Sequence, residues 1–191
     1  MAVQKTVRYV ILGQVGLFFF LIVCIILMPR FLFERDEGGL SNYGTYVKTV
    51  VPYSFALGLS GLLNLKAAAS MDYPTKASQR LRKVLATLGV GGIIVLLSTY
   101  PYKLNTVLAD MHIGLSVLLF TFELMAGVWF VRVVVNNKLA IALLGVQVVG
   151  FLLILSSTIG FIRILLLAQM LTSLAFGVLM VRAVAGAVRV T

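Results

Sequence analysis

The sequence has 191 residues, of which 61% are hydrophobic and 12% charged, and its mean hydropathy is +1.07. Soluble globular domains are about half apolar and about a quarter charged, so this composition excludes that class and indicates an integral membrane protein. The net charge of +10 would favour a nucleic-acid partner in a soluble chain. Here most Lys and Arg lie in short connections on one side of the expected membrane spans, so we expect no nucleic-acid partner.

Six apolar stretches long enough to cross a bilayer follow one another along the chain. We therefore predict an all-α, polytopic transmembrane bundle that forms a single domain over residues 1–191. The first stretch ends in Ile-Ile-Leu-Met-Pro rather than in small residues, so we interpret it as an uncleaved span and not as a signal peptide. The predicted spans cover about residues 8–28, 47–65, 84–100, 110–131, 139–155 and 161–182.

The basic residues predict the orientation of these spans. Eleven of the sixteen Lys and Arg fall on one side of the six-span topology. Cytoplasmic loops carry the excess of basic residues in membrane proteins, so we expect both termini to be cytoplasmic in a multi-pass protein of the cell membrane. The segment 66–83 is predicted to be a polar cytoplasmic loop. We interpret its charges chiefly as a topology signal, and contact with anionic lipid headgroups is the alternative.

The fourth span carries the only histidine of the chain, His112, and the only carboxylate near the middle of a span, Glu123. Eleven residues separate them, which puts both within roughly 20° on one helical face. The same spacing separates them by about 16 Å along the axis, too far for a direct proton relay. We therefore treat them as members of two different groups.

The first group is a polar layer inside the bundle. Estimated depths place four polar side chains in a slab roughly 10 Å thick. We expect Glu123 to be protonated and to hydrogen-bond at least one of the three glutamines, so that neither partner is left unsatisfied in lipid. A hydrogen-bonded plug is the favoured interpretation, and a polar cavity is the alternative. The members of this layer are Gln14, Glu123, Gln147 and Gln169.

The second group lies at the outer surface, where His112 and Asp110 begin the fourth span and Ser41 and Asn42 lie in the first outer connection. We predict that Asp110 and His112 contact this connection and hold residues 41–44 over the mouth of the bundle. Nearby carboxylates with one His could bind a divalent metal, but zinc sites usually use two or more His or Cys ligands, so we expect no metal.

Known catalytic motifs do not occur in the sequence. It contains no G-x-S-x-G, G-x-x-x-x-G-K-[ST] or H-E-x-x-H string. One histidine excludes a bis-His haem site and a multi-His zinc site, and the sixth span has no lysine for a retinal Schiff base. We therefore expect no cofactor and favour a function other than catalysis.

One resemblance rests on a few residues. It comprises a first connection that ends Leu40-Ser41-Asn42-Tyr43-Gly44, a second span that contains proline, and His112 opening a fourth span with Gly114 and Ser116 after it. This arrangement resembles bacterial multi-pass membrane proteins related to the Frag/DRAM/Sfk group. Ser41 and Gly44 correspond to the Pro-x-Ile-Ser-Asp-x-Gly loop of that group, whose other residues are not matched. Since some members are tied to lipid remodelling, the resemblance implies lipid handling.

Three functional classes remain open, and each predicts a different interior. Binding or handling of a lipid or small amphiphile within the bundle, our first interpretation, predicts a cavity that reaches Glu123. A structural subunit of a membrane complex, or a homo-oligomer, predicts a packed interior and an exposed face of small residues. A membrane enzyme predicts that His112, Asp110 and the acids of the first connection converge. The expected partners are membrane lipids and, for the second class, another membrane protein.

Overall fold

The structure is a computed structural model, and it describes residues 2–32, 39–71, 75–101, 103–135, 137–161 and 164–189. The described residues form six long helices and no strand. Two short 3₁₀-helices, η1 (Pro29–Leu32) and η2 (Leu40–Thr45), lie between the first two long helices. The long helices are α1 (Ala2–Leu27), α2 (Val50–Ser70), α3 (Lys76–Thr99), α4 (Thr106–Trp129), α5 (Lys138–Thr158) and α6 (Leu165–Arg189).

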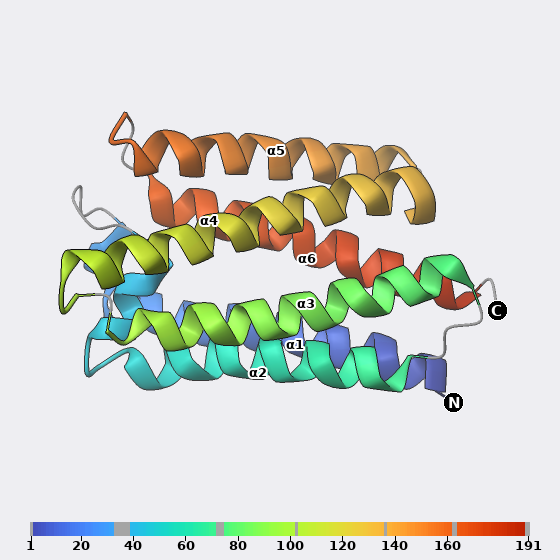
Figure 1. Cartoon of the computed structure of the whole chain (residues 1–191), viewed down its shortest axis with the longest axis horizontal. Coiled ribbons are helices and arrows are strands. Elements are labelled where there is room, and N and C mark those ends of the chain that lie inside the picture. The colour runs from blue at the N-terminus through green and yellow to red at the C-terminus, as the bar shows by residue number, and fades with distance from the viewer. Residues whose placement is uncertain are drawn as a thin grey trace.

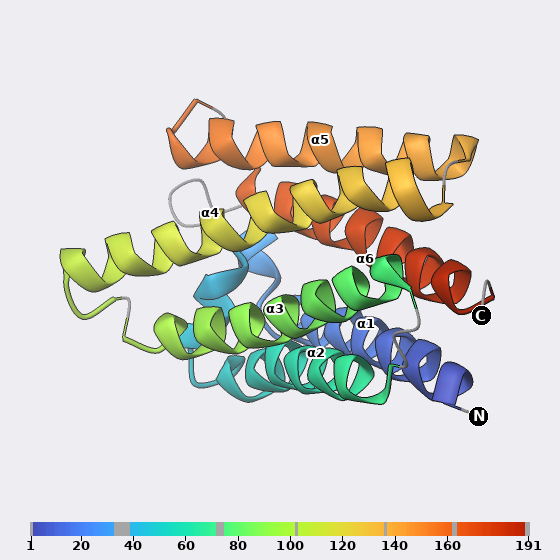
Figure 2. The ribbon, with the colours of Figure 1, turned by 45° about the vertical axis from the view of Figure 1, so that its right-hand side comes forward.

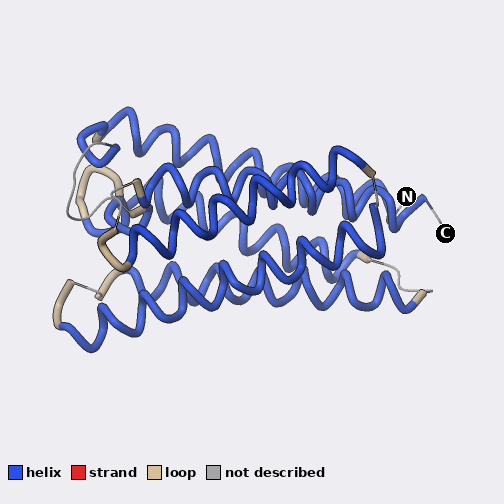
Figure 3. Tube along the Cα trace, turned by 90° about the horizontal axis from the view of Figure 1, so that it is seen from above, coloured by secondary structure: helices blue, strands red, loops and turns tan. Residues whose placement is uncertain are grey.

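The long helices run side by side in alternating directions along the long axis of the molecule (Figure 1). The start of α1 and the end of α6 lie at one end, which we call the terminal end (Figures 1 and 2). The opposite end carries η1 and η2, and we call it the capped end. The helices α1, α2 and α3 pack together on one side, α5 lies on the other side against α4 and α6, and the view from above shows the same elongated bundle (Figure 3).

Five helices are long and apolar enough to cross a membrane: α1, α3, α4 with its extension, α5 and α6. Their outward faces carry large apolar side chains such as Val15, Ile26 and Leu118, which are 60%, 71% and 67% exposed. Exposed apolar surface of this extent is costly in water, and in a membrane it faces lipid. The helix α2 carries Asn64 and Lys66 and is less apolar, but it packs along both α1 and α3.

Two helices extend well beyond the predicted spans. The segment 66–83, predicted to be a loop, consists mostly of the last turn of α2 and the first two turns of α3. Thr75 caps α3, because its hydroxyl accepts from the Ser78 amide at 3.1 Å while the Ser78 hydroxyl accepts from the Thr75 amide. The loop prediction was wrong because it followed charge, whereas the run of alanines after Lys66 and the buried Leu81 favour helix.

The fourth helix is also longer than expected. Asn105 caps its start, accepting from the Leu108 amide at 2.9 Å, so α4 begins four residues before the predicted span. At its other end the helix continues through the π-helical segment η3 (Phe130–Val135). Asn137 then caps α5 by accepting from the Ala140 amide at 2.9 Å.

Close backbone contact joins α2 to α3 near their middles. A Cβ added to Gly89 would lie 2.8 Å from the Gly61 carbonyl oxygen and 2.7 Å from Leu65 Cγ. A Cβ added to Gly61 would in turn lie 3.0 Å from the Gly89 carbonyl oxygen. Small residues at facing positions let membrane helices approach this closely, and here they fix the position of α2 relative to α3.

This contact gives the first prediction. Gly89→Ala should destabilise the folded protein by about 1–3 kcal/mol, because the new methyl group meets backbone that cannot move aside easily. The measurement is reversible unfolding in mixed micelles. Gly114→Ala is the matched control, since no atom lies within 4 Å of a Cβ at that position. Equal stability of the two variants would contradict the packing described here.

Candidate functional site

A cavity of about 110 Å³ lies inside the bundle between α1, α2, α3, α4 and α6, and η2 contributes to its wall at the capped end. This volume equals roughly three to four water molecules at about 30 Å³ each. Most of its wall is apolar. Among the lining residues that the structure describes, Glu123 is the only carboxylate, and none is a Lys, Arg or His. The polar side chains of the wall are Gln14, Ser41, Ser60, Asn64, Ser116, Glu123, Gln169 and Ser173.

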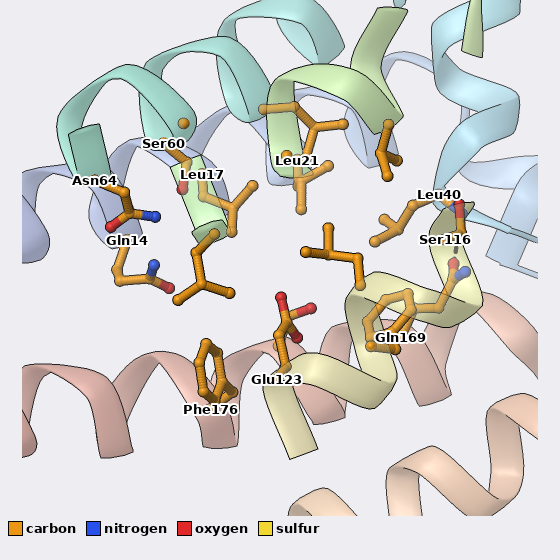
Figure 4. Close-up of a pocket in the computed structure, with 18 of the residues that line it drawn as sticks. Gln14, Leu17, Leu21, Leu40, Ser60, Asn64, Ser116, Glu123, Gln169 and Phe176 are labelled. Carbon is orange, nitrogen blue, oxygen red and sulfur yellow. Dashed lines mark hydrogen bonds between the residues drawn. The ribbon is translucent and has the colours of Figure 1, made fainter. Parts of the chain in front are cut away.

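The carboxylate of Glu123 is directed into this cavity, with Phe176 on one side and Gln169 on the other (Figure 4). Its Oε2 atom is buried and has no hydrogen-bond partner. The predicted hydrogen bond to a glutamine is absent among the described residues, so the prediction of a hydrogen-bonded plug was wrong. The interior holds a cavity that reaches Glu123, which was the alternative.

Three of the four predicted layer residues, Gln14, Glu123 and Gln169, line the cavity, and Gln147 does not. Gln147 is fully buried against α4, where its side-chain oxygen occupies the space that a Cβ on Gly127 would need. The direction of its side chain did not follow from the depth at which the sequence placed it. Because α5 is apolar on all its faces, its sequence does not show which face turns towards the other helices.

Gln169 has a different partner from the one predicted. Its Oε1 accepts a hydrogen bond from the backbone amide of Leu40 at 2.8 Å and so ties α6 to η2. Leu40 and Ser41, the first two residues of η2, both line the cavity. The short helix η2 therefore forms the wall of the cavity at the capped end.

Packing and further hydrogen bonds hold η2 in place. Thr49 donates from its hydroxyl to the Tyr43 carbonyl oxygen at 2.7 Å, and Gly44 lies so close to Tyr53 and Thr99 that a side chain there would clash. The ring of Tyr43 packs edge-on against Phe31 at 5.2 Å between centroids. Burial raises the pKa of the Tyr43 phenol to about 12, so this anchor stays neutral at physiological pH.

His112 connects η2 to both α3 and α4. It is 3% exposed, its Nε2 lies 2.6 Å from Ser41 Oγ, and its Nδ1 lies 2.8 Å from Ser98 Oγ. The predicted contact between His112 and the first connection is therefore present. Ser98 had no sequence signal, because a serine near the end of an apolar span is common and nothing in its spacing relates it to His112.

The hydrogen bonds define which ring nitrogen carries the proton. The Ser98 hydroxyl has one hydrogen and donates it to the Val95 carbonyl oxygen at 2.9 Å. Ser98 Oγ must then accept from His112 Nδ1–H. The neutral ring consequently has its lone pair on Nε2, and the Ser41 hydroxyl donates to it.

The rest of the predicted outer cluster does not converge on His112. Asp110 is exposed, so its predicted role in holding η2 was wrong: two residues from His112 on a helix, it points to another side. Asn42 is buried within η2, where its backbone carbonyl accepts from the Thr45 hydroxyl at 2.9 Å. The acids at positions 34, 36 and 37 lie outside the described residues. In the described ranges no three His, Cys, Asp or Glu lie together as a metal site would need.

Asn64 was not predicted as a site residue. It is 5% exposed, lines the cavity from α2, and its side-chain oxygen has no partner. The signal was present in the sequence, since an amide within an otherwise apolar span is uncommon. No protein family, curated protein or solved structure matches this chain.

The anchoring of η2 gives the second prediction. His112→Leu removes the hydrogen bonds to Ser41 and Ser98, and the loss of a buried hydrogen bond costs about 1–3 kcal/mol. Amide exchange over residues 40–45 should therefore become about 5- to 100-fold faster, as measured by hydrogen–deuterium exchange with mass spectrometry. Asp110→Asn, an exposed change two residues away, should leave exchange in this segment unaltered. Unchanged exchange in the His112 variant would show that packing alone holds η2.

Proposed function

We propose that the protein binds one end of a lipid or small amphiphile in the cavity beside Glu123, within the cell membrane. The observation that carries this proposal is the cavity itself, which brings a buried carboxylate, amides and hydroxyls together inside an apolar bundle. A ligand with one polar end and an apolar remainder matches such a wall.

The size of the cavity limits which part of a ligand enters it. Pockets for drug-sized ligands measure about 300–1,000 Å³, several times the 110 Å³ available here. A whole lipid does not fit, so a headgroup or a chain end enters and the rest extends beyond the cavity. The resemblance to the Frag/DRAM/Sfk group, some of whose members are tied to lipid remodelling, supports a lipid as the ligand.

The polar atoms of the wall favour a ligand that donates hydrogen bonds. Glu123 Oε2 and Asn64 Oδ1 are buried acceptors without partners. Buried polar atoms are normally paired, and an unpaired one costs about 1–3 kcal/mol. A hydroxyl or amine at the polar end of the ligand would supply the missing donor, whereas an anionic headgroup would enter a wall in which the described residues include no Lys or Arg.

We further propose that all six long helices span the membrane and that both termini are cytoplasmic. The helix α2 has the length of a span and lies between two helices that are apolar enough to cross. The described basic residues concentrate towards the terminal end, where cytoplasmic loops of membrane proteins carry their positive charge. The residues of this group that the structure describes are Lys5, Arg8, Lys66, Lys76, Arg80, Arg82, Lys83, Arg132, Lys138, Arg182 and Arg189.

This topology gives the third prediction. Single cysteines placed at residue 2 and at residue 191, in a Cys24→Ser background, should react with a membrane-impermeant maleimide only after the cells are opened. A cysteine at Leu104, which is 76% exposed in the turn before α4, should react from outside intact cells. Labelling of residue 191 in intact cells would remove the six-span topology.

The ligand site gives the fourth prediction. A long-chain alcohol that carries a photoactivatable group near its hydroxyl should cross-link to cavity residues of the purified protein in nanodiscs. Glu123→Leu should weaken this binding by about 2- to 10-fold, since a hydrogen bond between neutral groups contributes about 0.5–1.5 kcal/mol. Glu123→Gln keeps a hydrogen-bond acceptor and should weaken binding less than Glu123→Leu does.

The control for this experiment is Gln147→Leu. It removes a buried polar side chain that lies outside the cavity, and binding should persist wherever the variant remains folded. Equal cross-linking of the wild-type protein and Glu123→Leu would contradict the proposed site.

A structural role in a membrane complex remains the second candidate, because one specific feature favours it. Gly114 on α4 and Gly145 on α5 are exposed, and nothing lies within 4 Å of a Cβ at either position. Small residues on an outward face allow close approach of another membrane helix. Disulfide cross-linking between Gly145→Cys chains in a Cys24→Ser background would support a homo-oligomer, and a monomer at all protein-to-lipid ratios would count against it.

A further inference from the structure

We infer that Ser41 is a nucleophile, activated by His112, that accepts the acyl group of an ester bound in the cavity. This inference rests on the proposed function, because the ester is taken to be the polar end of the bound amphiphile. It adds an activity to the binding site and assigns it to a serine–histidine pair.

The hydrogen bonds around His112 have the polarity that a general base requires. A nucleophilic serine donates its hydroxyl hydrogen to an imidazole nitrogen that is unprotonated, and a third group fixes the tautomer through the other nitrogen. Here Ser41 Oγ lies 2.6 Å from Nε2, and Ser98 Oγ lies 2.8 Å from Nδ1. Because Ser98 gives its own hydrogen to Val95, it holds the proton on Nδ1, and Nε2 accepts from the Ser41 hydroxyl.

The position of Ser41 at the cavity wall is also suited to reaction with a bound ester. Ser41 lines the cavity, whereas His112 is not part of the wall and lies buried behind it. An ester carbonyl in the cavity can therefore approach Ser41 while His112 remains buried.

The chemical step is an acyl transfer. Ser41 Oγ attacks the ester carbonyl carbon, and the hydroxyl proton moves to Nε2 of His112 as the Oγ–C bond forms. The bond between the carbonyl carbon and the alcohol oxygen then breaks, and the alcohol leaves with the proton from Nε2. The products are an acyl ester of Ser41 and a free alcohol, and attack by water or a second alcohol through the same steps regenerates Ser41.

The group that the described residues place at Nδ1 of His112 is the Ser98 hydroxyl, and this sets the expected speed. A buried Asp in this position would stabilise the imidazolium that forms, whereas the neutral hydroxyl of Ser98 only orients the ring. Asp110 does not take this role, since it is exposed. Acylation should therefore be slow, and a single covalent modification is a better measure than turnover.

The test uses the purified full-length protein in nanodiscs and two fluorophosphonate probes, one with a short and one with a long alkyl chain. Mass spectrometry follows covalent modification and locates it. The expected result is modification of Ser41 that Ser41→Ala abolishes and that His112→Gln slows by about 100-fold or more. Ser157→Ala, a serine on α5 outside the cavity, should not alter the rate.

Two further measurements separate catalysis from a merely structural role. In the wild-type protein the modification rate should fall at acidic pH, because protonated His112 cannot accept the Ser41 hydrogen. Ser98→Ala should slow modification and Ser98→Thr should restore it, since threonine keeps the hydroxyl. Modification of Ser41 that is slower than 1% of the protein per day, or that is insensitive to His112→Gln and to pH, would overturn the inference.

The two probes also distinguish this inference from the proposed binding function. Reaction of Ser41 with both probes at equal rates, without competition by a long-chain alcohol, would contradict amphiphile binding and support the reactive serine. Cross-linking of the photoactivatable alcohol to the cavity without modification of Ser41 by either probe would retain binding and remove the nucleophile.

Discussion

Two hydrogen bonds to the start of η2 help to position this short helix at the capped end of the bundle. Gln169 accepts from the backbone of Leu40, and His112 accepts from the hydroxyl of Ser41. They join α6 and α4 to a segment that the chain places between α1 and α2. They hold Leu40 and Ser41, which line the cavity, against these two helices. The cavity and the serine–histidine pair therefore depend on the same two contacts.

The cavity contains buried acceptor atoms that have no hydrogen-bond partner in the described part of the protein. Inside a membrane bundle each polar atom needs a partner from the protein, from water or from a ligand. Gln169 Oε1 and His112 Nε2 bond to η2, whereas the buried Glu123 Oε2 has no hydrogen-bond partner among the residues that the structure describes. A structural plug would pair Glu123 within the protein, whereas the observed geometry leaves it available to a ligand inside a space of about 110 Å³. This difference is the reason for preferring a binding function over a purely structural one.

The sequence predicted the helical bundle well, because long apolar stretches separated by polar or turn residues leave few alternatives. It also predicted that His112 meets the first connection, since both belong to the same side of the membrane. Helix ends were less predictable, because the charged residues from Lys76 to Lys83 form helix when helix capping and buried leucines favour it.

The interior could not be predicted to the same degree. The depth of a side chain follows from its position along a helix, but the direction in which it points can be predicted only for a helix with a polar and an apolar face. The helices that carry Glu123 and Gln147 are apolar nearly all round. Gln147 accordingly faces Gly127 instead of the cavity, and Ser98 joins His112 without any motif in the sequence. Asn64 could have been recognised as a polar side chain in a span, but its proximity to Glu123 required the packing of α2.

An experimental structure of the protein in lipid nanodiscs, at a resolution that shows bound lipid, tests the central claim most directly. The account predicts density in the cavity beside Glu123 that continues as a chain beyond it, with η2 held by Gln169 and His112. A closed interior in which Glu123 hydrogen-bonds Gln14 or Gln169, with no space between α1, α3 and α4, would contradict it.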